Sequence, residues 1–464
     1  MLSRITSIWR NDPILRRVVK NSGHLVSGNA VAALLGYGQS LLVVRLIGVP
    51  DLGLVTAVIT FASNINRLLT FRMSEIVVQR LGAALPRSSP GSGEVVPVLE
   101  RGTGEGEKVE AAAAVKAAML TEAVTSIVAF IILAVLTPWA AVSFGKDIQT
   151  APLFLFYGLI LLTNIIAESS TGALQALRRF DSIARINVAQ SIVTAGLILA
   201  AFLMGRGIFE IILAYVVGKS INGLGLAVLA LRELHQVLGA GWWKTPLRKV
   251  GDKRGMFTFM LNTNLNGTLN VFTRDNIPLY LAYLLGTTEA GYFKIALSLI
   301  NLIIIPLDPL IGPTYSEISR TVALKQWDAT RQLLRRVSLI TTSVVVAIGS
   351  GLALTGWFLL PLLNGGPAAA PAYPVLLILL IGYGFASIFQ WNRPLMLALG
   401  KPSYPLLVSF LVGLAELALI FGLVPLVPHF GYLVLVGIFS AYFVVSIGII
   451  VWRGLAEITR RSAQ

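Results

Sequence analysis

Residues Leu46–Gly53 read Leu-Ile-Gly-Val-Pro-Asp-Leu-Gly, and residues Leu284–Gly291 read Leu-Leu-Gly-Thr-Thr-Glu-Ala-Gly. Both follow the pattern Leu-aliphatic-Gly-x-x-acid-x-Gly, and 238 positions separate them. A second pair, Ala176–Arg179 and Ala398–Lys401, begins with Ala-Leu and is 222 positions apart. An insertion of 16 residues in the first half explains the change of offset. The sequence therefore predicts an internal repeat with a turn between apolar stretches.

The composition indicates that the bilayer is the solvent. Hydrophobic residues make up 55% of the 464 residues and charged residues 13%, whereas soluble proteins have about 25% charged residues. The mean hydropathy is +0.78. Little chain remains for a large soluble catalytic domain, and the absence of cysteine excludes disulfides, iron–sulfur clusters and thiol catalysis. The net charge of +15 does not indicate nucleic acid, because nucleic-acid binders carry their basic residues on a polar, soluble surface.

We expect an all-α polytopic membrane protein of about twelve transmembrane helices, in two parallel-related six-helix lobes around a central cavity. Spans of about 20 apolar residues cross a bilayer, and six crossings return the chain to its starting side. The predicted spans are 25–47, 52–71, 116–137, 151–174, 184–204, 208–231, 256–285, 290–313, 337–363, 371–399, 404–426 and 430–452.

The basic residues predict the orientation. The loops after the odd-numbered spans hold only Lys146 and Arg206, while most of the other Lys and Arg lie in the two tails and the even-numbered loops. Under the positive-inside rule, both termini are expected to face the cytoplasm. The expected location is the cytoplasmic (inner) membrane. The predicted divisions are a cytoplasmic N-terminal segment 1–24, a first lobe 25–232 with a flexible loop 86–110, a linker 233–255, a second lobe 256–453 and a cytoplasmic tail 454–464.

Polar side chains share helical faces inside these spans. Thr56, Thr60, Ser63, Arg67 and Thr70 follow helical spacing in the second span, and the eighth span repeats the stripe 238 positions later. Interhelical hydrogen bonding explains single Asn and Thr residues about equally well. Charged residues cost about 2.5–3.5 kcal/mol within a span and so favour a wet cavity. The expected substrate-binding residues are Arg67, Lys219, Arg274, Lys294, Arg393, Asn262, Asn266, Asn270, Asn301 and Gln390.

The basic residues in the spans outnumber the acidic ones, which favours an anionic substrate, because guanidinium and ammonium groups bind phosphate oxygens by charge-assisted hydrogen bonds. Asn, Thr and Gln suit sugar hydroxyls. Asp275, Glu416 and Glu168 are the expected ion-coupling carboxylates. We expect no catalytic residue, no cofactor and no metal site, since the three histidines are scattered, and we expect a proton or sodium gradient as the energy source.

The sequence resembles the polysaccharide-transporter branch (Wzx-type flippases) of the multidrug/oligosaccharidyl-lipid/polysaccharide exporter superfamily. The matching residues are Ser27-Gly28-Asn29, Leu46–Gly53, Arg178-Arg179-Phe180 and Leu284–Phe293 with Asp275 upstream. The resemblance implies a flippase for undecaprenyl-diphosphate-linked oligosaccharide (O-antigen, capsule or exopolysaccharide unit), driven by an ion gradient without ATP. It also implies contact with glycan-assembly proteins. The chain departs from the family in having Val49 before Pro50, and Leu52 where an aromatic is usual.

Two other functions remain open. A multidrug or small-solute antiporter of the same superfamily would favour a more acidic or apolar cavity. A membrane glycan polymerase or glycosyltransferase would need catalytic groups on a large outer loop, whereas the longest predicted outer loop, 138–150, offers Lys146 and Asp147.

Overall fold

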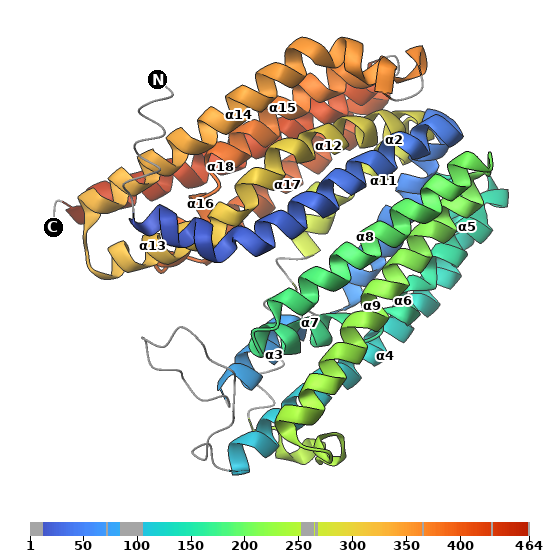
Figure 1. The fold of residues 1–464 in the computed structure, drawn as a ribbon. Coiled ribbons are helices and arrows are strands. Elements are labelled where there is room, and N and C mark those ends of the chain that lie inside the picture. The colour runs from blue at the N-terminus through green and yellow to red at the C-terminus, as the bar shows by residue number, and fades with distance from the viewer. Residues whose placement is uncertain are drawn as a thin grey trace. The chain divides into compact units, whose positions relative to one another are not determined.

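Helices form every regular element in the part of the chain that the computed structural model describes, which is 13–70, 73–83, 105–251, 264, 268–363, 366–427 and 430–462. Within that part, ten helical segments are long and apolar enough to cross a membrane. They are Gly38–Leu69, Lys108–Phe144, Ile148–Ala176, Phe180–Leu203, Ile208–Leu238, Thr287–Leu307, Trp327–Leu362, Pro367–Ala398, Ser403–Leu426 and Gly431–Ser462. The predicted all-α polytopic fold is confirmed (Figure 1).

The chain forms two compact units, which we describe separately. Unit 1 comprises Met1–Ala57 and Phe272–Gln464, and unit 2 comprises Val58–Val271. Helix α2 (Pro13–Leu69) belongs to both. The other helices of unit 2 are α3 (Met73–Ala83), α4 (Glu105–Phe144), η1 (Ile148–Thr150), α5 (Ala151–Gly158), α6 (Ile160–Thr163), α7 (Ala167–Ala176), α8 (Phe180–Leu203), α9 (Ile208–Leu238), η2 (Trp242–Lys244) and η3 (Leu247–Lys249).

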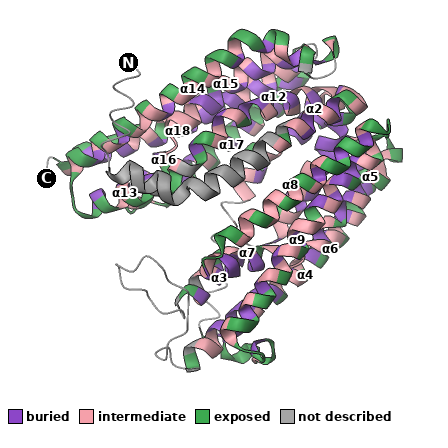
Figure 2. Ribbon diagram, viewed as in Figure 1, coloured by how far each residue is buried: buried purple, intermediate pink, exposed green. Residues whose placement is uncertain are grey.

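Unit 1 contains the C-terminal helices. A π-helix, η4 (Val271–Asp275), leads into it. The helices that follow are α11 (Ile277–Leu284), α12 (Thr287–Leu307), η5 (Asp308–Leu310), α13 (Ile311–Ala323), α14 (Trp327–Leu363), η6 (Pro367–Ala369), α15 (Ala372–Ile388), α16 (Asn392–Ala398), α17 (Ser403–Leu423), η7 (Val424–Leu426) and α18 (Gly431–Ser462). Buried residues line the sides where α12, α15 and α18 meet (Figure 2).

The two repeated glycine turns pack against each other within unit 1. Gly48 interrupts α2 with φ 81°, and Gly286 precedes α12 with φ 146°, conformations that favour glycine. A Cβ added to Gly53 would overlap the carbonyl oxygen of Thr287, and a Cβ added to Gly291 would overlap that of Val49. Thr287 lies 238 positions after Val49, as Gly291 does after Gly53, so the two contacts are equivalent under the repeat. The first glycine turn, Leu46–Gly53, therefore packs within unit 1.

The second repeated motif ends α7 and α16 in the same way. Both helices end at the matched alanine, and Arg178 and Gly400, 222 positions apart, both take positive φ, 57° and 76°. The backbone N–H of the next residue then donates to a carbonyl of the helix that it follows. Arg179 donates to Leu174 at 2.8 Å, and Lys401 donates to Met396 at 2.9 Å. Such a left-handed cap satisfies the last carbonyls of a helix.

An ion pair repeats with this cap. Arg179 lies 3.1 Å from Glu233 of α9, and Lys401 lies 2.9 Å from Glu457 of α18. In each unit the basic residue after the cap thus fastens a short helix to the long helix that ends the unit. The internal repeat predicted from the sequence is confirmed in local geometry.

Several predicted boundaries differ from the observed ones. Helix α4 begins at Glu105, inside the predicted loop 86–110, because acidic residues and four alanines favour a helix start there. Helix α9 continues to Leu238 in the predicted linker, and α18 continues to Ser462 in the predicted tail. The first two predicted spans form one helix interrupted at Gly48. Residues 256–263 and 265–267 of the predicted span 256–285 lie outside the described residues, so the number twelve stays a prediction, as do the lobe bounds.

We expect Gly53→Ala to lower the melting temperature of the detergent-purified protein. The new methyl group would press on the Thr287 carbonyl, and overpacking costs about 1–3 kcal/mol. Gly38→Ala in the same helix is the control, since no atom lies within 4 Å of its added Cβ. Equal melting temperatures for the two variants would contradict the packed-turn interpretation.

Candidate functional site

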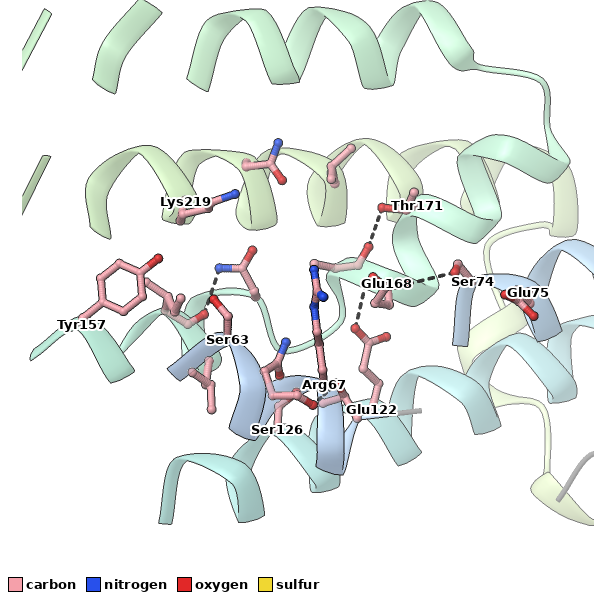
Figure 3. A pocket seen from close by; sticks show the side chains of 18 of the residues that line it. Ser63, Arg67, Ser74, Glu75, Glu122, Ser126, Tyr157, Glu168, Thr171 and Lys219 are labelled. Atoms are coloured by element: carbon pink, nitrogen blue, oxygen red, sulfur yellow. Dashed lines mark hydrogen bonds between the residues drawn. The ribbon is translucent and has the colours of Figure 1, made fainter. Parts of the chain in front are cut away.

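Unit 2 encloses a polar cavity of about 620 Å³. Of its nineteen lining residues, ten are uncharged and polar, five are charged and four are apolar. The lining residues are Ser63, Asn66, Arg67, Thr70, Ser74, Glu75, Glu122, Ser126, Tyr157, Ile160, Leu161, Asn164, Ala167, Glu168, Thr171, Lys219, Asn222, Leu226 and Asn270. Figure 3 shows Lys219 and Tyr157 toward one end, Glu122, Glu168 and Ser74 toward the other, and Arg67 between them.

Two helices place their polar stripes on this cavity. Ser63, Arg67 and Thr70 follow the spacing i, i+4, i+7 at the end of α2, as the sequence predicts for one helical face. Lys219 lies on α9 with Asn222 one turn later. The cavity therefore receives its two cations from the helices α2 and α9.

The membrane segment Ile148–Ala176 is broken where it lines the cavity. Helix α6 ends at Thr163 and α7 begins at Ala167. The Asn164 amide donates to the Ile160 carbonyl at 2.8 Å, and the Ser220 hydroxyl of α9 donates to Thr163 at 3.0 Å. The Asn164 amide thus adds a second hydrogen bond to a carbonyl that already accepts the Asn164 backbone N–H, and Ser220 joins α9 to the Thr163 side chain.

Glu122 of α4 spans this break. Its side chain is buried, and its two oxygens accept the backbone N–H groups of Glu168 and Ser169, each at 2.8 Å. The Glu168 carboxylate in turn accepts the Ser74 hydroxyl at 2.8 Å. Glu122 was not among the residues expected from the sequence, although a carboxylate in the alanine-rich stretch of the third span was a visible signal.

The charge balance of this cavity differs from the expected cationic one. Arg67 and Lys219 face three carboxylates, those of Glu75, Glu122 and Glu168. Glu122 was not counted from the sequence, and Glu75 lies in α3, between the predicted spans. Only two of the five expected cations line this cavity, so the cationic central cavity stays a prediction.

The expected site residues separate into two groups. Arg67, Lys219, Asn270 and Glu168 line the cavity of unit 2. Asn262 and Asn266 lie outside the described residues. The others belong to unit 1, where Asn301 and Arg393 are exposed, and Lys294, Asp275 and Gln390 are half-buried. Their roles stay predictions.

Arg274 and Glu416 have distinctive surroundings in unit 1. The Arg274 guanidinium, in the π-helix, lies 5.8 Å from the ring centre of Tyr383 and 5.6 Å from that of Phe443, as in cation–π contacts. Glu416 in α17 is buried, and neither of its carboxylate oxygens has a hydrogen-bond partner in the described part of the protein. In that part, no group of three or more His, Asp or Glu residues could hold a metal ion.

A polysaccharide biosynthesis protein family profile matches residues 107–365, more than half of the chain. The chain belongs to this family. Over 317 residues it is 25% identical to the inner membrane protein YghQ of Escherichia coli K12, covering 67% of this chain and 83% of that protein. The ten apolar helical segments of the described chain indicate a multi-pass membrane protein.

Solved structures share the fold. The lipid II flippase MurJ, inward closed, has a TM-score of 0.67 at 12% identity, covering 94% of this chain and 89% of its own. An inward-facing multidrug resistance MATE transporter of the MOP superfamily has 0.64 at 14% identity, covering 93% and 96%. A MOP superfamily transporter from Pyrococcus furiosus has 0.63 at 15% identity, covering 98% and 97%. The family match thus connects the chain to polysaccharide biosynthesis, and the solved structures show that it shares the fold of these membrane proteins.

We expect a water-filled cavity, which thiol labelling can test because the chain has no cysteine. Ser63→Cys would lie in the cavity, whereas Val124→Cys would lie on the outer surface of α4, where Val124 is 60% exposed and where we expect lipid or detergent to cover it. A charged, water-soluble thiol reagent should react on the order of tenfold faster at position 63, because apolar surroundings disfavour the reactive thiolate. Equal rates at the two positions would show that the cavity is not hydrated.

Proposed function

We propose that this protein moves a polyprenyl-diphosphate-linked oligosaccharide across the cytoplasmic membrane by alternating access, as a gradient-driven flippase. The glycan would be an O-antigen, capsule or exopolysaccharide unit. The family's role in polysaccharide biosynthesis supports the glycan, and the fold shared with a lipid II flippase supports a lipid-linked form of it.

The polar cavity of unit 2 carries this proposal. Its volume of about 620 Å³ falls within the range of about 300–1,000 Å³ typical of ligand sites. Its ten uncharged polar residues offer amides and hydroxyls, which both donate and accept hydrogen bonds as sugar hydroxyls do. Such a lining inside a unit of apolar helices costs stability unless a polar ligand or water fills it.

The cations are proposed to bind the diphosphate. Arg67 and Lys219 share the cavity of unit 2. Arg274 and Arg393 offer exposed guanidinium groups in unit 1, with Lys294 on α12. Guanidinium groups engage two phosphate oxygens at once.

A proton or sodium gradient is the proposed energy source. Glu416 supports this proposal because a buried carboxylate without a hydrogen-bond partner is costly while it is charged and bare. Binding of a proton or a sodium ion removes that cost. Asp275 and Glu168 are further proposed coupling residues, and Glu168 places its carboxylate at the cavity itself.

The proposed function also implies an orientation in the membrane and a class of partner proteins. Both termini are proposed to face the cytoplasm, where lipid-linked glycans would be loaded, and glycan-assembly proteins are the proposed partners. The basic residues of the tails and even-numbered loops support this orientation.

A multidrug or small-solute antiporter is the second candidate. The specific observation in its favour is that three carboxylates line the cavity of unit 2 against two cations. Carboxylates suit cationic solutes, so charge removal at the cavity distinguishes the two functions.

We expect the double variant Arg67→Gln, Lys219→Gln to reduce glycan export about tenfold or more, since each hydrogen bond to a charged group contributes about 1.5–3 kcal/mol. The double variant Arg274→Ala, Arg393→Ala should do the same. Export is measured by surface glycan in a strain that lacks the chromosomal gene. Arg185→Gln is the control, because its side chain is 83% exposed on α8. Normal export with both double variants would contradict diphosphate binding, and altered drug resistance instead would favour the antiporter.

We expect flipping to stop when the proton and sodium gradients are dissipated in proteoliposomes. Glu416→Gln should abolish gradient-driven flipping, because glutamine can neither take up nor release a proton at this buried position. Asp328→Asn is the control, since its carboxylate is 98% exposed. Unchanged transport in de-energised vesicles would contradict gradient coupling.

A further inference from the structure

Glu122 makes a contact between two helices that no local cap could replace. It lies on α4, and the N–H groups it accepts belong to the second and third residues of α7. The residue before α7, Ile166, has no side chain able to cap the helix. Glu122 therefore supplies from a neighbouring helix what an N-cap side chain usually supplies from the same one.

The electrostatics favour this contact. The first N–H groups of a helix carry partial positive charge, and a carboxylate near them is stabilised. The bonds are charge-assisted, and the carboxylate is 2% exposed, so little water competes for them. The contact is therefore specific to a carboxylate, since a glutamine of the same shape would present an amide donor to one of the two N–H groups.

The start of α7 bears directly on the cavity. Glu168 and Thr171 line it, and the Glu168 carboxylate accepts the Ser74 hydroxyl of α3. Gly172 packs closely on the backbone of Ser74, where a Cβ would lie 2.6 Å from the Ser74 Cα. Helix α7 is thus fixed to α3 by packing along its length and to α4 by Glu122 at its start.

We propose that Glu122 is a positioning residue for transport: its carboxylate ties α4 to the start of α7 and so holds Glu168 and Thr171 at the cavity wall. This inference rests on the proposed function only for its consequence in transport. The tie itself involves only groups of this chain.

Electron paramagnetic resonance tests the tie without any substrate. A nitroxide label on Thr171→Cys reports on α7, and a label on Ser63→Cys reports on α2 across the same cavity, each in the otherwise cysteine-free full-length chain. With Glu122→Gln, we expect the mobile component of the Thr171 spectrum to rise on the order of tenfold, as loss of a charge-assisted hydrogen bond predicts. The Ser63 spectrum should not change.

Glu110→Gln is the matched control, since it makes the same change on the same helix. Glu110 does not line the cavity and lies 3.8 Å from Arg80, with its side chain 46% exposed. It should leave both spectra and export unchanged, whereas Glu122→Gln should reduce export of the cell's own glycan on the order of tenfold.

Three results would overturn the proposal. They are an unchanged Thr171 spectrum with Glu122→Gln, equal loosening at both labels, and a loosened α7 with normal export when the cation variants of the cavity do reduce export. If neither Glu122→Gln nor the cation variants of the cavity reduced glycan export while the spectra behaved as expected, the proposed function would fail and the tie would stand.

Discussion

The cavity of unit 2 depends on one constraint: a backbone that leaves the helical path inside a membrane must find every hydrogen-bond partner within the protein. The segment Ile148–Ala176 leaves that path between Thr163 and Ala167. Glu122 accepts the N–H groups of Glu168 and Ser169 at the start of the next helix, and Asn164 and Ser220 add side-chain hydrogen bonds beside the break. The same side chains then make this break polar, and the break becomes a wall of the cavity.

The two halves share turns but differ in polar chemistry. The caps after α7 and α16 match, as do the ion pairs that follow them. By contrast, the position 222 residues after Glu122 is Val344, so the second half has no carboxylate there. Near the start of α16, the Trp391 indole donates to Ser338 at 2.7 Å instead. The repeat therefore carries the architecture, whereas the carboxylate of Glu122 is particular to the first half.

The sequence was most informative where a pattern is local. Apolar stretches predicted the membrane helices, and the glycine turns predicted the repeat, because backbone conformation at Gly48 and Gly286 depends on residue type. Helical spacing also placed Ser63, Arg67 and Thr70 on one face, and these residues line one cavity.

What the sequence could not predict depends on contacts between distant segments. Nothing in the spacing around Glu122 shows that it meets the start of α7, 46 residues later. Periodicity likewise does not show that Glu75, outside the predicted spans, lines the cavity with Lys219. The charge of a site is a sum over elements that only the fold brings together, so the sequence does not show which carboxylates accompany Arg67 and Lys219 in this cavity.

The most direct test of the account is photo-crosslinking in living cells between the cavity and a lipid-linked glycan labelled in its sugar. A photoreactive residue at Ile160 would lie on the cavity. One at Leu162, which does not line the cavity and is 37% exposed, is the control. The account predicts an adduct that carries labelled sugar at position 160 and little or none at 162. Equal labelling at both positions, or none at 160 in cells that still export the glycan, would contradict it.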